Sequence, residues 1–180
     1  MTLGRWKKIA GAIVHRNPWW SYRRDDVTLP SGSRGEYHYV HTPGSVMVVP
    51  RHADGRILLV RQYRYLNDRD SVEFPAGGIK EGQGSEAAAR AELREEAGVE
   101  AGILEEIGQF NPFNGVTDEL CVVFAARELS PCAAHPDETE EFEVLRCEEA
   151  EIRRMIADGR IWDGMTLAAW AMLQEKGGSR

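Results

Sequence analysis

Residues 73–99 read EFPAGGIKEGQGSEAAARAELREEAGV, and this segment is the most informative part of the 180-residue chain. A glycine-rich loop comes first, over residues 76–84. A helix is expected over residues 85–97, with Ser85 as its N-cap and Gly98 at its end. Serine is a favoured N-cap residue, and glycine adopts the left-handed conformation that commonly ends a helix.

Three glutamates of this helix, Glu92, Glu95 and Glu96, have the spacing i, i+3 and i+4, which places their carboxylates on one face. Like charges so spaced destabilise an isolated helix by roughly 0.2–0.5 kcal/mol per pair, so a compensating cation is expected. Mg²⁺ takes oxygen ligands and pairs carboxylates with substrate phosphates, and the preceding loop can add a backbone carbonyl. The alternative is a solvated acidic face with Arg90 and Arg94 as partners.

The segment resembles the signature of the Nudix hydrolase family, G-x5-E-x7-R-E-U-x-E-E-x-G-U, where U is aliphatic. Seven of the nine defined positions agree in register, namely Gly77, Glu92, Leu93, Glu95, Glu96, Gly98 and Val99. Gln83 stands where the first Glu belongs, and Ala91 stands where the Arg belongs. In the family this pair is described as supporting the loop–helix geometry. Its joint loss predicts either a looser but active site or a site that only binds nucleotides.

The resemblance implies a divalent cofactor, Mg²⁺ or Mn²⁺. Its ligands would be Glu92, Glu95, Glu96 and the carbonyl of Ala76, with Glu95 and Glu96 also counted as catalytic. Gly77 belongs to the loop that would contact the substrate. Metal ions beside a pyrophosphate can activate water and stabilise the leaving phosphate.

Outside this segment, the sequence resembles the ADP-ribose pyrophosphatase and nucleotide-sugar hydrolase branch of the family. Residues 60–65 read VRQYRY and residues 73–78 read EFPAGG, which is similar to that branch's signature. The resemblance implies that Arg64 contacts a substrate phosphate, and a surface salt bridge at a strand end is the alternative. Residues 111–119 occupy the position of a substrate-facing loop, with asparagines at serine-like positions.

This branch places its general base, or a water-orienting glutamate, in a late loop before a strand. Residues 135–141 form such a loop, and Glu140 is the best match for the base. Glu141 is the runner-up, and Glu138 is a further candidate. The alternative is an exposed acidic loop without a function.

An N-terminal extension, residues 1–42, is expected to precede the Nudix domain at residues 43–180. Strands around residues 19–29 and 36–41 predict a β-hairpin, with the start of the chain loosely attached. Because a lone hairpin is only marginally stable, it should pack on another element, which fits a swapped homodimer.

Two tryptophans, Trp19 and Trp20, open this hairpin. In this branch the N-terminal segment often crosses to a second subunit and helps to hold the base, so the pair is predicted to bind substrate by stacking. The alternative is a plug in the dimer interface or in the core.

The second region is expected to combine strands and helices in a mixed α/β (α+β) fold, a Nudix-like α/β/α sandwich of mixed sheet and flanking helices. After a turn at Asp54-Gly55, residues 57–60 are predicted to return beside the strand at residues 45–50. Further strands are expected near residues 104–109, 120–128 and 142–146. Two helices are predicted in residues 147–180, with apolar faces formed by Ile152, Met155 and Ile156 and by Leu167, Trp170, Ala171 and Leu173, and with Trp162 and Trp170 in the core.

The composition of the chain limits the classes of partner and the cellular compartment that are expected. A formal charge of −7 and a pI of about 5.3 argue against general nucleic-acid binding, which needs a basic face. The three cysteines, Cys121, Cys132 and Cys147, form no CxxC pair and are expected as free thiols in a reducing cytosol. No apolar run is long enough for a signal peptide or a membrane span, so a cytoplasmic protein without membrane partners is predicted.

The combined prediction is a metal-dependent pyrophosphohydrolase that cleaves a nucleoside diphosphate sugar. ADP-ribose is the first candidate, with AMP and ribose 5-phosphate as products. GDP-mannose or another nucleotide sugar is the alternative substrate. A non-catalytic, nucleotide-binding Nudix domain is the alternative from a different class.

Overall fold

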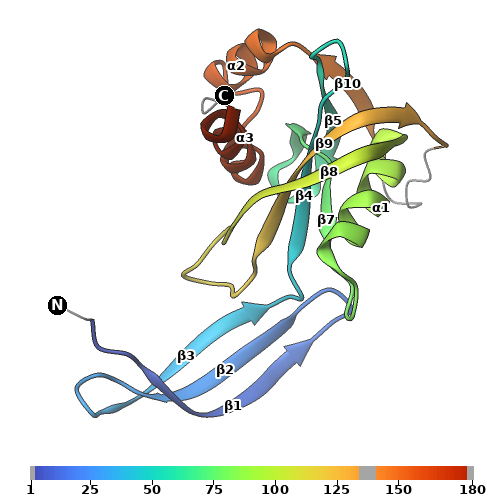
Figure 1. Ribbon diagram of the computed structural model, residues 1–180. Coiled ribbons are helices and arrows are strands. Elements are labelled where there is room, and N and C mark those ends of the chain that lie inside the picture. The colour runs from blue at the N-terminus through green and yellow to red at the C-terminus, as the bar shows by residue number, and fades with distance from the viewer. Residues whose placement is uncertain (1–2, 134–140, 178–180) are drawn as a thin grey trace. The chain divides into compact units, whose positions relative to one another are not determined.

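The computed structural model describes residues 3–133 and 141–177 (Figure 1). Its elements are β1 (Lys7–Arg16), β2 (Ser21–Thr28), β3 (Arg34–His41), β4 (Ser45–Pro50), β5 (Ile57–Arg64), the 3₁₀-helix η1 (Tyr65–Asn67), β6 (Arg69–Glu73), β7 (Ala76–Gly78), α1 (Ser85–Ala97), β8 (Val99–Phe110), β9 (Cys121–Pro131), β10 (Glu143–Cys147), α2 (Glu149–Ala157) and α3 (Gly164–Gly177). The chain divides into an N-terminal unit, made of the segment up to Pro43 with Asn111–Glu119, and a core unit made of Gly44–Phe110 and the chain from Leu120 onward.

The N-terminal unit contains the predicted hairpin as β2 and β3 and extends it to a three-stranded antiparallel sheet, β1-β2-β3. The expectation of a loosely attached start is wrong, because β1 pairs with β2 along nearly its whole length. The apolar residues 9–14 suit a strand, and the side chain of Asn17 closes the turn that follows. Its Oδ1 accepts hydrogen bonds from the backbone N–H groups of Trp19 and Trp20, at 2.9 and 2.8 Å.

The loop Asn111–Glu119 is the other part of the N-terminal unit. The N–H of Val40, on β3, donates to the carbonyl of Val116 at 2.9 Å. Asn111 closes the loop on itself, since its Nδ2 donates to the carbonyls of Thr117 and Glu119 at 3.0 and 2.7 Å. This loop was expected within the second region of the sequence, and only its long-range pairing with β3 places it here.

Two sheets form the core unit, one of four strands in the order β7-β4-β9-β8 and one of three in the order β10-β5-β6. All neighbours are antiparallel except β4 and β9, which are parallel. The prediction that β5 returns beside β4 is wrong, because the two strands lie in different sheets and share one isolated bridge, Arg51 to Ile57. Both edges of β4 are already paired with β7 and β9, which leaves no edge for β5.

The predicted α/β/α sandwich is confirmed by the packing of β4 and β5. Val46, Val48 and Leu58 belong to one apolar cluster with Leu93 of α1. Their sequence neighbours Met47, Val49, Ile57 and Leu59 belong to a second cluster with Ile152, Met155, Ala169 and Trp170 of α2 and α3. Side chains alternate across a strand, so one face of each strand packs toward α1 and the other toward α2 and α3 (Figure 1).

The predicted limits of α1 are confirmed, but its N-cap is not Ser85. Gly84 takes the N-cap position with extended backbone angles, and Ser85 is already helical. At the other end Gly98 has φ 62°, a left-handed conformation that costs glycine little, and its N–H donates to the carbonyl of Leu93.

The C-terminal helices are present and Trp170 is buried in the core, as predicted. Trp162 is not a core residue, because it precedes α3 and lies half-buried with its Nε1 donating to the carbonyl of Asp70 at 3.1 Å. Ala171 is exposed and does not share the buried face of α3. Among the described residues, no helix has the length and hydropathy to cross a bilayer.

Candidate active site

The carboxylate of Glu96 lies on the buried side of α1. The buried residues of this helix are Ala88, Ala89, Leu93, Glu96 and Ala97, a helical stripe that contains one acidic side chain. Glu96 is only 6% exposed, and a buried carboxylate is costly unless it is hydrogen-bonded. Its Oε2 accepts a hydrogen bond from the backbone N–H of Ala76 at 3.0 Å. This bond joins α1 to the glycine-rich loop.

Glu92 meets the same loop one residue further along. A Cβ placed on Gly77 would overlap the Glu92 carboxylate, so the missing side chain is what lets the two approach. The backbone on which they converge is fixed, because β7 pairs with β4 from Met47–Ala76 to Ser45–Gly78. Two of the three predicted carboxylates therefore lie against residues 76 and 77.

Glu95 is half-buried on the same helix. Within residues 3–133 and 141–177, no three His, Cys, Asp or Glu side chains are gathered closely enough to hold a metal ion. The structure thus brings Glu92 and Glu96 to the loop without completing the triad. The donor chemistry fits a hard divalent cation, because such an ion takes oxygen ligands and two carboxylates lie against this loop.

Arg64, at the end of β5, forms a two-bond ion pair with Glu73, the last residue of β6. Its Nε donates to Glu73 Oε1 at 2.8 Å, and its Nη2 donates to Oε2. Gln62 adds a long contact from Nε2 to the same carboxylate, at 3.5 Å. Glu73 is buried, and its hydrogen bond raises the pKa of Arg64, with smaller contributions from the charges of Asp163 and Glu96. The guanidinium is therefore a permanent, oriented cation near Glu96.

The predicted base lies in a segment that contains both Glu138 and Glu140, and both fall outside the described residues. Glu141 is described and is exposed two residues before β10 begins.

The predicted aromatic pair, Trp19 and Trp20, is exposed in the turn between β1 and β2, with Trp19 at 76%. Sequence reasoning missed a second aromatic pair of the N-terminal unit, Tyr37 and Tyr39 on β3. Together with Asn111, Asn114, Thr117 and Asp118 they line a cavity of about 420 Å³. The aromatic–polar alternation of residues 36–41 was the available signal, and it indicated a strand without indicating what its side chains face.

The buried carboxylate, the loop it holds and the spacing of the glutamates agree with the match of residues 41–166 to the NUDIX domain model. The chain belongs to the Nudix family. Residues 6–40 match the model of the nucleoside diphosphate sugar hydrolase N-terminal domain.

Relatives of this Nudix protein include the ADP-ribose pyrophosphatase of Bacillus subtilis (strain 168), which is 34% identical over 154 residues, or 84% of this chain and 83% of the relative. The methanol dehydrogenase activator of Bacillus methanolicus is 34% identical over 152 residues, or 83% of this chain and 82% of the relative. The crystal structure of an ADP compounds hydrolase superposes with a TM-score of 0.85 over 100% of this chain and 99% of that one, at 23% identity, and shows the same fold.

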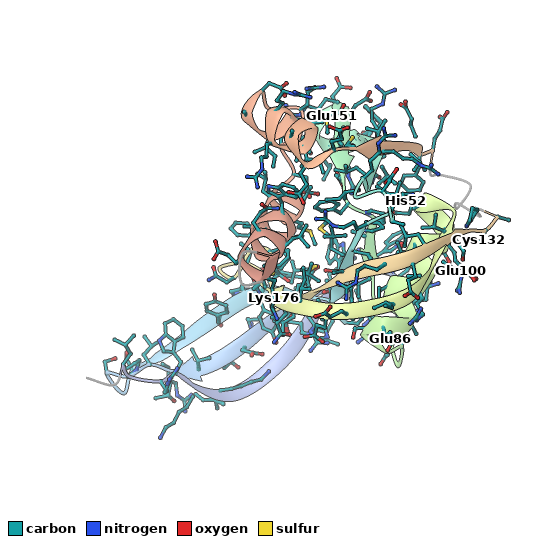
Figure 2. All side chains as sticks on the ribbon, turned by 45° about the horizontal axis from the view of Figure 1, so that its top comes forward. His52, Glu86, Glu100, Cys132, Glu151 and Lys176 are labelled. Atoms are coloured by element: carbon teal, nitrogen blue, oxygen red, sulfur yellow. The ribbon has the colours of Figure 1, made fainter. Side chains whose placement is uncertain are left out.

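The two departures of this Nudix protein from the family signature have local replacements. Gln83 bonds within its own turn, since its Oε1 accepts from the N–H of Lys80 at 3.0 Å. Ala91 has no polar side chain with which to support the loop–helix geometry, but the preceding residue, Arg90, forms hydrogen bonds that hold the helix. Its Nη1 donates to the carbonyl of Ala101 on β8 at 2.8 Å, while its Nε and Nη2 donate to the Glu86 carboxylate. Glu86 lies in the first turn of α1 (Figure 2). Arg90 therefore fastens α1 to the neighbouring strand.

We expect Arg90→Gln to lower the free energy of unfolding by about 1.5–3 kcal/mol, the usual contribution of a hydrogen bond to a charged group. Arg94→Gln is the matched control, because Arg94 is exposed on the same helix, and it should change stability by less than about 0.5 kcal/mol. Urea denaturation of the two variants measures the difference, and equal midpoints would contradict the assigned role of Arg90.

Proposed function

We propose that the chain hydrolyses the pyrophosphate bond of a nucleoside diphosphate sugar, with ADP-ribose as the substrate and AMP and ribose 5-phosphate as products. The observation that carries the proposal is the convergence of Glu92 and Glu96 on residues 76 and 77 in a chain whose N-terminal unit matches a sugar-nucleotide hydrolase module. The name of the Bacillus subtilis relative favours ADP-ribose over GDP-mannose or another nucleotide sugar.

We propose Glu92, Glu95, Glu96 and the carbonyl of Ala76 as the residues that would hold Mg²⁺ or Mn²⁺. Bound there, such an ion would polarise the phosphate oxygens and neutralise charge that develops on them. Glu96 has a further task, since its bond to the Ala76 N–H keeps the loop and α1 at a fixed separation. Glu95 would join the set by a change of its own side-chain rotamer.

Hydrolysis adds one water across the pyrophosphate. The water oxygen bonds to one phosphorus, the bridging P–O bond breaks, and each product keeps one phosphate. We propose that Glu140 accepts the proton of this water, with Glu141 as the second candidate. Arg64 would contact a phosphate oxygen through the N–H groups that its pair with Glu73 leaves open.

The N-terminal unit is proposed to hold the base. Trp19 and Trp20 offer exposed aromatic faces, and base–aromatic stacking contributes about 1–3 kcal/mol per base. The Tyr37–Tyr39 cavity offers a second surface, where the buried Oδ1 of Asn111 has no hydrogen-bond partner among the described residues.

Product analysis tests the proposed reaction. Purified protein with Mg²⁺ should release AMP and ribose 5-phosphate from ADP-ribose, and Glu96→Gln should reduce turnover on the order of 100-fold, as loss of one electrostatic partner of a transition state does. The exposed Glu106→Gln should turn over normally. Preference for GDP-mannose or UDP-glucose would revise the substrate. No turnover of any compound, with Mg²⁺ or Mn²⁺, would instead favour a nucleotide-binding domain without catalysis.

A pair of glycine variants tests the loop independently. Gly77→Ala should displace the Glu92 carboxylate and reduce turnover on the order of 100-fold with little loss of stability, since the group it meets is the end of a flexible side chain. Gly78→Ala is the control, because a Cβ there meets nothing within 4 Å. Equal activity of the two variants would argue against the contact between Gly77 and Glu92.

We further propose a homodimer formed through the N-terminal unit and a cytoplasmic location. All ten residues of β1 are exposed, among them Ile9, Ile13 and Val14 at about half their area, and exposed apolar edge strands favour association. The free state of the three cysteines suits a reducing compartment.

Light scattering after gel filtration tests the dimer. Wild type should have twice the 20.2 kDa chain mass, and Ile13→Lys should shift the protein toward the monomer. Glu100→Gln makes the same change of charge at an exposed site on β8 and should leave the mass unchanged. A wild-type monomer at all concentrations would contradict the proposal.

A further inference from the structure

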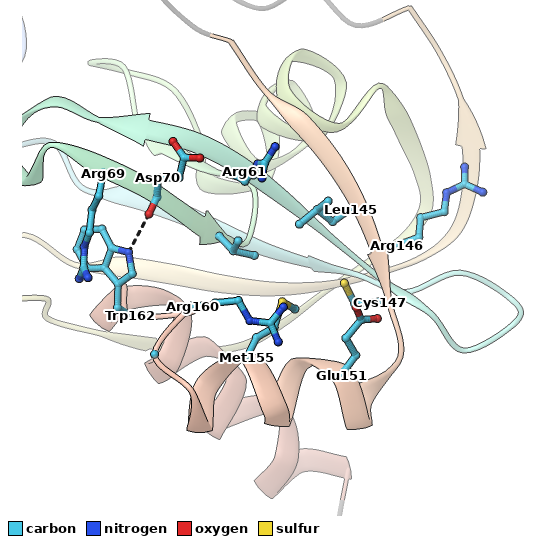
Figure 3. A pocket seen from close by; sticks show the side chains of 12 residues that line it. Arg61, Arg69, Asp70, Leu145, Arg146, Cys147, Glu151, Met155, Arg160 and Trp162 are labelled. Atoms are coloured by element: carbon cyan, nitrogen blue, oxygen red, sulfur yellow. Dashed lines mark hydrogen bonds between the residues drawn. The ribbon is translucent and has the colours of Figure 1, made fainter.

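A cavity of about 460 Å³ lies in the core unit between the β10-β5-β6 sheet and α2 (Figure 3). Its lining includes Arg61, Arg69, Arg160, Trp162, Leu145 and Met155. A volume of this size falls within the roughly 300–1,000 Å³ typical of small-ligand sites. Neither the Nudix signature at residues 77–99 nor the proposed reaction uses any of these residues, although Arg61 belongs to the branch segment at residues 60–65.

The cavity and the Arg64–Glu73 pair lie on opposite faces of the β10-β5-β6 sheet. On β5, Ile57 and Leu59 pack in the cluster with α2 and α3, whereas Leu58 packs in the cluster with α1. Continuing this alternation, Arg61 lines the cavity, and Arg64 is three residues further along and binds Glu73 on the other face. A ligand in the cavity would therefore be separated from the Arg64–Glu73 pair by the sheet.

Four arginines line the cavity, and three of them, Arg61, Arg69 and Arg160, have guanidinium N–H groups that an anion could reach. Arg61 pairs with Glu143, and Arg160 pairs with Asp158 at 2.8 Å, but all four side chains are about half exposed. Exposed ion pairs contribute only about 0–1 kcal/mol, so an incoming phosphate can take over these donors at small cost. Arg146 also borders the cavity, and its side chain extends away from the group in Figure 3.

Arg69 is held in an orientation suited to anion binding by stacking on Trp162. Its guanidinium carbon lies 3.8 Å from the centroid of the Trp162 ring, and Trp162 is fixed in turn by the bond from its Nε1 to the Asp70 carbonyl (Figure 3). Stacking occupies the face of the guanidinium and leaves its in-plane N–H groups available, which is the geometry that arginine uses for phosphate.

The floor of the cavity is apolar and uncharged. Val72, Leu145 and Met155 line it beside the thiol of Cys147. Burial raises the pKa of this thiol to about 11, with further contributions from the charge of Glu151 and from a hydrogen bond to it, so the thiol is neutral at physiological pH. The Glu151 carboxylate, which also lines the cavity, thus accepts a hydrogen bond from this thiol and is attracted by the nearby charge of Arg160.

We propose that this cavity is a second binding site, specific for a small phosphomonoester. The phosphate would bind to the guanidinium groups of Arg61, Arg69 and Arg160, and the body of the ligand would lie against Trp162 and the apolar floor. The chain carries a formal charge of −7, so anion binding needs a local cluster of cations such as this one. The site does not depend on the proposed hydrolysis, although both proposed products belong to this ligand class.

Calorimetry without divalent cations tests the site directly. The probes are AMP, ribose 5-phosphate and inorganic phosphate, with adenosine and ribose as controls that lack the phosphate. The phosphate-bearing probes should bind and the controls should not. The double variant Arg69→Gln/Arg160→Gln should weaken binding at least about tenfold, the equivalent of about 1.4 kcal/mol. Arg154→Gln, on the exposed side of α2, should leave binding unchanged.

The indole N–H signal of Trp162 in a nitrogen–proton correlation spectrum locates the ligand, and Trp162→Phe identifies that signal among those of the five tryptophans. It should shift on titration in wild type and in Glu96→Gln alike. Tighter binding of AMP than of ribose 5-phosphate would indicate that the adenine ring lies against Trp162. Equal affinity would indicate that only the phosphate is recognised, and either result supports the site. Binding that leaves Trp162 unmoved or survives the double arginine variant would overturn it, as would the absence of binding by all three probes.

Discussion

The hydrogen bond from the Ala76 N–H to the Glu96 carboxylate joins two segments that are twenty residues apart and sets the distance between them. A charge in the buried stripe of α1 would oppose packing without such a partner. The partner is itself fixed, because β7 is paired with β4, and β4 is buried on both faces. The loop at residues 76–77, α1 and β4 are therefore held together, and their packing fixes the positions of Glu92 and Glu96.

The family's support pair is absent at Gln83 and Ala91, and the geometry it would support is nevertheless present. Gln83 closes a turn with Lys80, and Arg90 reaches the carbonyl of Ala101. Both substitutes act over short distances and leave the Glu96 contact intact. This arrangement favours a functional hydrolase over a domain that has kept only nucleotide binding.

The alternation of β5 gives the core unit two chemically different faces. One face carries the ion pair of Arg64 with buried Glu73, next to the acidic helix. The other carries Arg61 above an apolar floor, opposite the arginine–tryptophan stack of Arg69 and Trp162. A single strand can serve two sites in this way because successive side chains point to opposite sides of the sheet.

The sequence by itself determined the family, the limits of α1, the positions of most strands and the common helical face of the three glutamates. These features depend on local spacing, which a linear pattern preserves. Tertiary structure decided the rest: that β4 and β5 lie in different sheets, that residues 111–119 join β3, and that Trp162 supports Arg69 and stays outside the core. It also decided that Glu96 is the buried member of its triad. Each of these outcomes depends on which strand edge or side-chain partner is available across long stretches of chain, and no local pattern records that.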